Sequence, residues 1–172
     1  MFSGPRNEGL DFSPMVVYTT NVPGTISASD MVQEAKGCVC FQAKRGMRAM
    51  TKAYDAALRP SGLRSTQFSM LGVVKAFGPL SSAKLGELMV LDKTTLPRSL
   101  ALLARAGLVQ MRQGTDKREK LLTLTAKGEL AIRRAYPLWK AAQDRVMKRL
   151  GPARFESLIK DLAEAAEAAK GG

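Results

Sequence analysis

Apolar side chains recur at intervals of three and four residues along much of this chain, a spacing that predicts amphipathic helices. The first pattern runs over residues 30–59, with Asp30 and Gln33 as a capping-box-like start and a Pro-Ser-Gly sequence at its end. Residues 1–29 contain glycines, prolines and scattered polar residues without a sustained period. We therefore expect one long first helix behind an extended N-terminal arm.

Three shorter helical patterns follow the first. One covers residues 65–77 and is closed by a Gly-Pro pair, and either serine at residues 81 and 82 can cap the next. The third ends at Gly107 and contains Pro97, although a proline inside a helix costs about 3 kcal/mol. If Thr94 is the N-cap, Pro97 is the third helical residue, where an amide has no partner within the helix. We therefore expect this helix to start at Thr94.

The apolar period changes from about 3.6 to two after Gly107. Val109 and Met111 alternate with polar residues, and so do Leu122 and Leu124. A Gly-Thr-Asp-Lys sequence at residues 114–117 separates the two runs, which predicts a β-hairpin with a basic tip. Two more helical patterns complete the chain, the first capped by a threonine at residue 125 and the second beginning after a Gly-Pro pair at residues 151–152.

Three short helices followed by a hairpin is the element order of a winged helix-turn-helix. The predicted fold class is mainly α with a small β-hairpin wing. We expect four segments: an extended arm at residues 1–29, a dimerisation helix at 30–62, a winged helix-turn-helix domain at 63–126 and C-terminal dimerisation helices at 127–172. The first and last helices carry apolar stripes that a single chain would leave uncovered, so we expect a homodimer.

Charge and composition narrow the class of function. The 27 Lys and Arg residues against 15 Asp and Glu give a net charge of +12, which favours a polyanionic partner, with nucleic acid ahead of an anionic membrane surface. The chain has no histidine and two cysteines, which removes Ser-His-Asp and Cys-His catalysis and leaves too few soft ligands for a zinc site. We expect no enzyme activity, cofactor or metal, and a cytoplasmic protein, since no apolar run approaches the roughly 20 residues of a membrane span.

Candidate DNA contacts lie on the helix that contains Pro97 and on the hairpin. Arg98 can read O6 and N7 of guanine, a contact worth roughly 1–3 kcal/mol of discrimination, and the neighbouring threonines suit phosphates or thymine methyls. Alternatively, Arg98 only solvates the helix surface, or the domain binds RNA or protein. The candidate DNA-binding residues are Lys93, Thr94, Thr95, Pro97, Arg98, Arg112, Lys117 and Arg118.

Residues 116–128, with the sequence DKREKLLTLTAKG, resemble the wing signature of the MarR family of bacterial transcriptional regulators. Residues 91–109 are similar to the recognition helix of that family, and residues 53–71 to the segment before it. The resemblance spans roughly residues 36–150. It implies an intertwined homodimer that reads a pseudo-palindromic operator in double-stranded DNA, usually as a repressor of neighbouring genes that a small ligand releases.

The same resemblance implies roles for single residues. Arg118 would enter the minor groove, and Asp116 would orient it. Leu102 and Ala104 depart from the family pattern, because many members carry charged residues there. Cys40 matches by its spacing the oxidised cysteine of the organic-hydroperoxide sensors of the family. Yet Cys40 also lies on an apolar stripe, where a cysteine usually acts as a small buried hydrophobe.

An aromatic or amphipathic carboxylate is the other candidate effector. Its pocket would need apolar walls and a fixed cation. Each side chain that could supply these also fits ordinary core or interface packing. The candidates for an effector pocket or sensor are Cys40, Met47, Arg48, Met50, Tyr54, Phe68 and Trp139, with Arg64 as an alternative cation.

Overall fold

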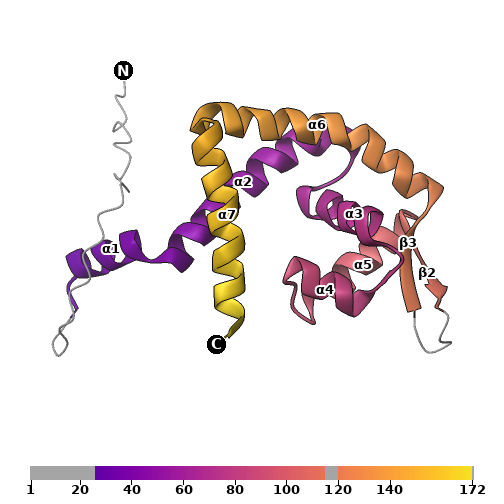
Figure 1. Cartoon of the computed structure of the whole chain (residues 1–172), viewed down its shortest axis with the longest axis horizontal. Helices are drawn as coiled ribbons and strands as arrows, with labels where there is room; N and C mark the ends of the chain where they lie inside the picture. Colours follow the sequence, from indigo (N-terminus) through magenta and orange to yellow (C-terminus); the bar gives the residue numbers. More distant parts are fainter. Residues whose placement is uncertain (1–25, 115–119, 172) are drawn as a thin grey trace, which may run out of the picture. The chain divides into compact units, whose positions relative to one another are not determined.

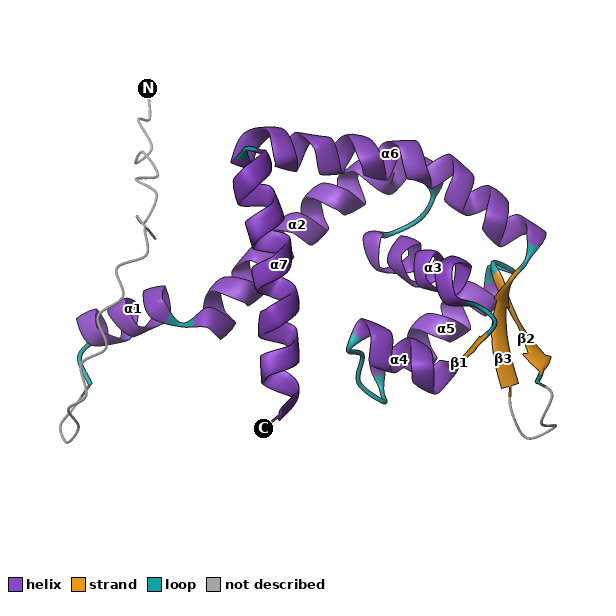
Figure 2. Cartoon of the chain, viewed as in Figure 1, coloured by secondary structure: helices purple, strands orange, loops and turns teal. Residues whose placement is uncertain are grey.

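The computed structural model describes residues 26–114 and 120–171. Within these ranges the regular elements are helices and three short strands, the strands drawn in orange in Figure 2. It divides into two compact units, one ending at Met50 and the other beginning at Thr51. The helices of the structure, in order, are α1 (Ala28–Gly37), α2 (Val39–Leu58), α3 (Ser65–Phe77), α4 (Ser82–Met89), α5 (Thr95–Arg105), α6 (Ala126–Leu150) and α7 (Pro152–Ala168).

The predicted single helix over residues 30–59 is wrong, because the chain leaves helical geometry at Cys38, with φ −75° and ψ 111°. Gly37, a weak helix former, immediately precedes the break. The Gln42 side chain donates to the carbonyl of Lys36 at 3.1 Å and so satisfies a backbone acceptor at the end of α1. The two helices on either side, α1 and α2, are therefore separate elements, and α2 continues across the boundary between the units.

The start of α1 also differs from the predicted capping box. Ser27 is the N-cap: its hydroxyl accepts from the Asp30 amide at 3.1 Å, and the Asp30 carboxylate accepts from the Ser27 amide at 3.1 Å. Asp30 is therefore the third helical residue rather than the cap, and its pair is Ser27 rather than Gln33. A serine hydroxyl and a carboxylate satisfy two amides that the helix itself leaves unpaired.

The second unit contains the predicted winged helix-turn-helix (Figure 1). α3 has the bounds expected from the sequence, and Ser81 caps α4 through its hydroxyl. The hairpin consists of β2 (Val109–Gln113) and β3 (Lys120–Leu124), paired antiparallel with Met111 opposite Leu122. A two-residue strand that the sequence did not indicate, β1 (Leu80–Ser81), pairs with the other edge of β3, so the sheet order is β1-β3-β2. Short 3-10 turns span Arg59–Ser61 and Ala169–Gly171.

The core of this unit lies between the three short helices, the sheet and α6. Ile132 and Ala135 of α6 are buried in it, and the Phe68 ring stacks on Trp139 with 5.7 Å between centroids. The fully buried large side chains are Leu58, Met70, Leu71, Leu85, Leu103 and Leu122. This packing fixes α5 and the hairpin side by side (Figure 1).

A compact joint connects α5, β2 and α6. Gly107, with φ +69°, ends α5: its amide donates to the Ala104 carbonyl at 2.9 Å, and the Leu108 amide donates to the Leu103 carbonyl at 3.0 Å. The Thr125 hydroxyl donates to the Gly107 carbonyl at 2.7 Å and accepts from the Gly128 amide at 3.0 Å. One side chain thus caps α6 and holds the end of α5.

Candidate nucleic-acid interface

The first turn of α5 has the register that Pro97 predicted. Thr94 is the N-cap by position, which makes Pro97 the third helical residue. The Thr94 side chain itself makes no capping hydrogen bond. The Asp92 carboxylate accepts instead from the amides of Thr94 and Thr95, at 2.8 and 2.7 Å. Pro97 lacks an amide, so it adds no unpaired donor to this turn.

Asp92 also accepts from both threonine hydroxyls, from Thr94 Oγ1 at 2.6 Å and from Thr95 Oγ1 at 2.7 Å. These hydrogen bonds hold the pKa of the Asp92 carboxyl well below its usual range. In this arrangement the hydroxyl protons point to Asp92 and not to solvent. The threonine methyl groups remain the parts of these side chains that are free to meet a ligand.

The exposed side of α5 is basic near its start. Leu96 and Leu103 are buried, whereas Lys93, Pro97 and Arg98 are exposed on or just before the first turn. The Asp92 side chain and backbone already accept the amides of Thr94, Thr95 and Leu96, so the positive charge of Lys93 and Arg98 is what favours an anionic partner here. The structure therefore presents Arg98 as the sequence predicted, on the outer side of a helix whose inner side is packed.

The hairpin presents a second basic position beside α5. Arg112 is exposed on β2, on the same side of the strand as Gln110. In the amide orientation that satisfies both groups, the Gln110 oxygen accepts from Arg112 Nη2 at 2.9 Å and from Nε at 3.1 Å. The predicted wing-tip residues Asp116, Lys117 and Arg118 lie outside the described residues.

The candidate effector residues divide between the two units. Cys40, Met47, Arg48 and Met50 belong to the first, where both Cys40 and Cys38 are exposed free thiols and Met47 is 61% exposed. Tyr54, Phe68, Arg64 and Trp139 belong to the second.

In the second unit, most of these candidates have structural partners. The Phe68–Trp139 stack is part of the core, and the Tyr54 hydroxyl donates to Gln143 Oε1. Partial burial raises the pKa of Tyr54. Arg64 is exposed beside the start of α3. In the part of the chain that the structure describes, no group of three or more His, Cys, Asp and Glu side chains could hold a metal ion.

Asp92 is the residue of this interface that sequence reasoning missed. The available signal was the local sequence Leu-Asp-Lys-Thr-Thr, since an aspartate two residues before a helix start commonly accepts backbone amides. In the structure Thr94 occupies the N-cap position, and the Asp92 carboxylate supplies the oxygen that accepts the backbone amides.

The packed helices, the three-stranded wing sheet and the basic first turn of α5 define a winged helix-turn-helix protein of the DNA-binding class. Comparison with known proteins makes the class more specific. Residues 61–119 match the MarR family, and the chain belongs to this family of DNA-binding transcriptional regulators, which are not enzymes.

Three relatives show how far the similarity extends. The solved structure of the M. tuberculosis transcriptional regulator MosR in complex with DNA is 41% identical, covers 77% of this chain and 98% of that one, and has a TM-score of 0.67. The uncharacterized HTH-type transcriptional regulator YwoH of Bacillus subtilis is 35% identical over 51% of this chain, but the match spans only 64% of YwoH. The organic hydroperoxide resistance transcriptional regulator of the same organism is 31% identical over 56% of this chain and 67% of its own length.

Among the described residues, the helices are too short or too polar to cross a membrane.

Proposed function

We propose that this protein is a homodimeric repressor that binds a pseudo-palindromic operator and controls neighbouring genes. The observation that carries the proposal is the exposed basic turn of α5, where Arg98 follows Pro97 on a helix whose buried side packs into the core of the second unit. The similarity to MosR, which was solved with DNA, supports the same use of this surface. Two copies would place two such turns on one symmetric site.

In this proposal the α5 residues have distinct roles at the DNA. Arg98 donates two guanidinium N–H groups to O6 and N7 of a guanine in the major groove. Thr94 and Thr95 contact a thymine through their methyl groups, because Asp92 holds their hydroxyl protons. Lys93 and Arg112 neutralise phosphates, while Lys117 and Arg118 at the wing tip reach the backbone and minor groove, oriented by Asp116.

Gel shifts on the protein's own promoter region test this assignment. Arg98→Ala and Arg118→Ala should each weaken operator binding by about tenfold or more, and Arg98→Ala should also relax selectivity at one base pair of each half-site. Arg105→Ala, which removes the same charge from the last turn of α5, is the matched control and should leave base selectivity unchanged. Unchanged operator affinity in both Arg98→Ala and Arg118→Ala would favour an RNA- or protein-binding winged helix instead.

The signal that releases the operator has two candidates. The first is a small aromatic or amphipathic ligand. The second is oxidation of Cys40 by an organic hydroperoxide, favoured by the exposed thiol and by the 31% identity to the organic hydroperoxide resistance regulator. A thiol can act as a sensor only where peroxide reaches it.

Cys40→Ser tests the thiol mechanism. If Cys40 is the switch, organic hydroperoxide should release the wild-type protein from its operator and leave Cys40→Ser bound. Cys38→Ser is the matched control, since Cys38 is also exposed and lies two residues away. Release of Cys40→Ser by peroxide at the wild-type concentration would remove Cys40 from the mechanism and leave ligand binding as the signal.

A further inference from the structure

The outer side of α5 carries an exposed leucine among its basic residues. Leu102 is 55% exposed, and it follows Arg98 by four residues and precedes Arg105 by three. Residues at these spacings share one side of a helix. Both arginines are also exposed, so Leu102 lies on the basic side of α5 that is proposed to face DNA.

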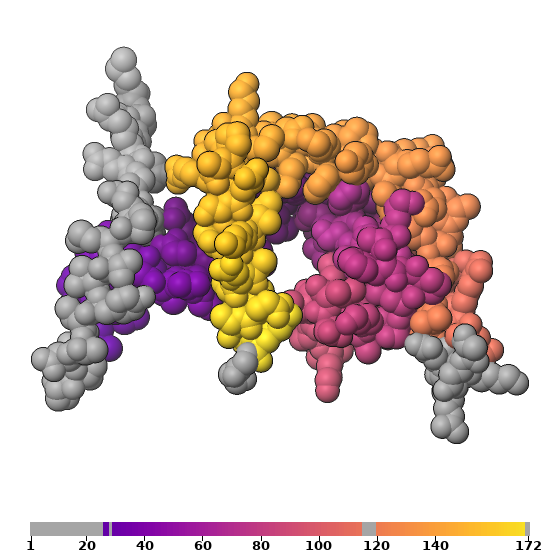
Figure 3. Space-filling view, viewed as in Figure 1, coloured from indigo at the N-terminus to yellow at the C-terminus, as the bar shows by residue number. Residues whose placement is uncertain are grey.

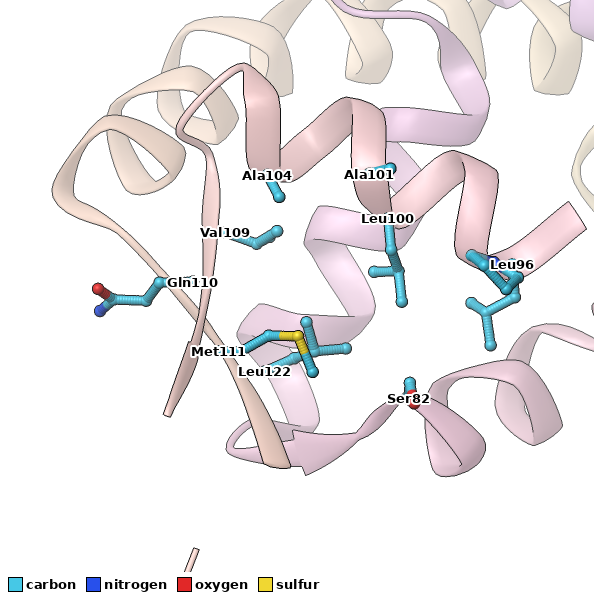
Figure 4. Close-up of a pocket in the computed structure, with 10 residues that line it drawn as sticks. Ser82, Leu96, Leu100, Ala101, Ala104, Val109, Gln110, Met111 and Leu122 are labelled. Carbon is cyan, nitrogen blue, oxygen red and sulfur yellow. The ribbon is translucent and has the colours of Figure 1, made fainter. Parts of the chain in front are cut away.

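The other sides of α5 pack within the chain. Leu96 and Leu103 are buried in the core. Leu100 and Ala104 line an apolar pocket between α5 and the hairpin (Figure 4), and Leu102 is not among the residues that line it. Leu102 is therefore directed neither into the core nor toward the hairpin.

Small residues flank Leu102 on α5. Ala101 precedes it and Ala106 follows it by four residues, and both are exposed. Their side chains end at Cβ, so the longer leucine side chain projects beyond them. Between Arg98 and Arg105, Leu102 is thus the apolar group that a bound duplex would meet first.

The chemistry of leucine limits what Leu102 can contact in a DNA groove. Single exposed leucines are common on protein surfaces, so its position on α5 matters more than its exposure. Leucine has no donor for a phosphate, and packing it against a polar base edge would remove water without a replacing hydrogen bond. The C5-methyl group of thymine is the apolar group that base edges present in the major groove. Leu102 therefore favours thymine over the other bases.

The spacing from Arg98 indicates where this thymine would lie. Four helical residues advance α5 by about 6 Å, and successive base pairs are about 3.4 Å apart. With α5 lying along the groove, Leu102 reaches about two base steps beyond the guanine assigned to Arg98. Thr94 and Thr95 precede Arg98 on the helix, so the thymine assigned to them lies on the opposite side of that guanine.

We propose that Leu102 is a specificity-determining residue and that it reads a thymine methyl group in each half-site of the operator. The assignment deepens the proposed function and rests on it, because it takes α5 as the helix that enters the major groove. It adds an apolar base contact, one turn further along the helix, to the guanine and threonine contacts proposed above.

Replacement of thymine by deoxyuridine tests this contact, because it removes the methyl group and leaves the base pairing unchanged. The probe is a duplex that the full-length wild-type protein selects from a random pool, remade with each thymine of one half-site replaced in turn. One replacement, about two base steps from the essential guanine, should weaken wild-type binding by about fourfold, the factor that burial of one methyl-sized group gives.

Variants of Leu102 assign that effect to its side chain. Leu102→Ala should bind the unmodified duplex more weakly and lose the sensitivity at this one thymine, while the sensitivity at the thymine of Thr94 and Thr95 persists. Leu102→Met, which keeps an apolar side chain of similar length, should retain the sensitivity. Leu88→Ala removes a leucine of α4 that is 41% exposed and is the matched control, which should keep the wild-type profile.

Salt dependence separates a lost methyl contact from a displaced helix. Leucine carries no charge, so Leu102→Ala should leave the slope of log affinity against log salt concentration unchanged. A changed slope, an unaltered deoxyuridine profile, or equal losses at every thymine in Leu102→Ala would overturn the proposal, as would loss of the sensitivity in Leu102→Met. If the wild type selects no duplex from the pool, the proposed function fails and the role of Leu102 with it. A selected duplex with an unaltered profile refutes the role of Leu102 alone.

Discussion

At the scale of single residues, Asp92 organises the start of α5 although it lies outside the helix. Its carboxylate accepts from two amides and two hydroxyls, all within 2.6–2.8 Å. A carboxylate at a helix N-terminus also complements the helix dipole. Asp92 therefore brings a negative charge next to a surface proposed to bind DNA, and in return it fixes the orientation of Thr94 and Thr95.

Asp92→Asn should lower the free energy of unfolding in a pH-dependent way. The pKa of Asp92 is lowered in the folded protein from an ordinary value of 3.8, so its stabilising effect is complete above that value and is lost as the pH falls toward the lowered pKa. In urea unfolding, the gap between wild type and Asp92→Asn should be constant from about pH 7 to about pH 4 and should narrow below it. A gap that stays constant down to about pH 2.5 would show that the carboxylate charge is not what stabilises this turn.

The threonine contacts are the least predictable part of this turn. The sequence places Thr94 and Thr95 at a helix start, and both phosphate and thymine contacts fit that placement. Only the coordinates show that the hydroxyl protons already have an acceptor. Rotamers and local hydrogen bonds of this kind do not follow from periodicity.

At the scale of elements, the joint around Thr125 explains why a glycine follows it three residues later. A Cβ on Gly128 would lie 2.1 Å from the Leu108 carbonyl oxygen, which is far inside contact distance. The missing side chain allows β2 to approach the first turn of α6, where Thr125 and Leu108 meet through the Thr125 amide at 3.1 Å. The glycine that ends the wing segment at residue 128 thus has a steric basis in this chain.

Gly128→Ala should therefore destabilise the fold, by about 1–3 kcal/mol, because α6 must shift away from Leu108. Gly72→Ala is the matched control: Gly72 lies within α3 and a Cβ there meets no atom within 4 Å. Since alanine is the better helix former, Gly72→Ala should stabilise by about 0.5–1 kcal/mol. Thermal or urea unfolding at one protein concentration measures both. Equal effects of the two substitutions would refute the steric account.

Element boundaries set by neighbouring glycine, proline or capping residues could be predicted from the sequence. Elements that depend on residues far away in the chain could not. α3 ends as expected because the Gly78-Pro79 pair is a local signal, whereas Asp55, ten residues earlier, accepts from the amide and hydroxyl of Ser65 at its start. β1 has two residues and exists only because β3, some forty positions later in the chain, offers it an edge. The pocket between α5 and the hairpin is lined by residues of α4, α5, β2 and β3, so no single stretch of sequence indicates it (Figure 4).

At the scale of the whole molecule, α7 contacts α6 but remains largely exposed in the part of the chain that the structure describes. It contains no buried residue, and its apolar side chains Ile159 and Leu162 are 50% and 46% exposed. The surface of α7, yellow in Figure 3, lies open on the viewed face. An exposed apolar helix of this kind is typical of a subunit interface. It supports the proposed homodimer, in which the segments 30–62 and 127–172 would form the contact.

Leu162→Asp should weaken self-association by about tenfold or more, because it places a charge within the proposed interface. Sedimentation equilibrium over a range of concentrations measures the dissociation constant. Leu88→Asp is the matched control, since Leu88 on α4 is 41% exposed and outside the proposed interface. Operator binding by Leu162→Asp should fall with dimer population. A wild-type protein that sediments as a monomer at micromolar concentration would contradict the dimer.

The joint at Thr125 has a mechanical consequence for such a dimer. The Thr125 hydroxyl lies 2.7 Å from the Gly107 carbonyl oxygen and 3.0 Å from the Gly128 amide nitrogen. It therefore holds the end of α5 close to the first turn of α6. The part of α6 before Pro137 is thus tied to α5, and a tilt of this part rotates α5 with it. Successive major grooves on one side of DNA are about 34 Å apart. A small rotation of α5 in each subunit would therefore move the two α5 helices out of register with these grooves. In the proposed dimer, α6 rather than a flexible linker therefore sets the distance between the two α5 helices.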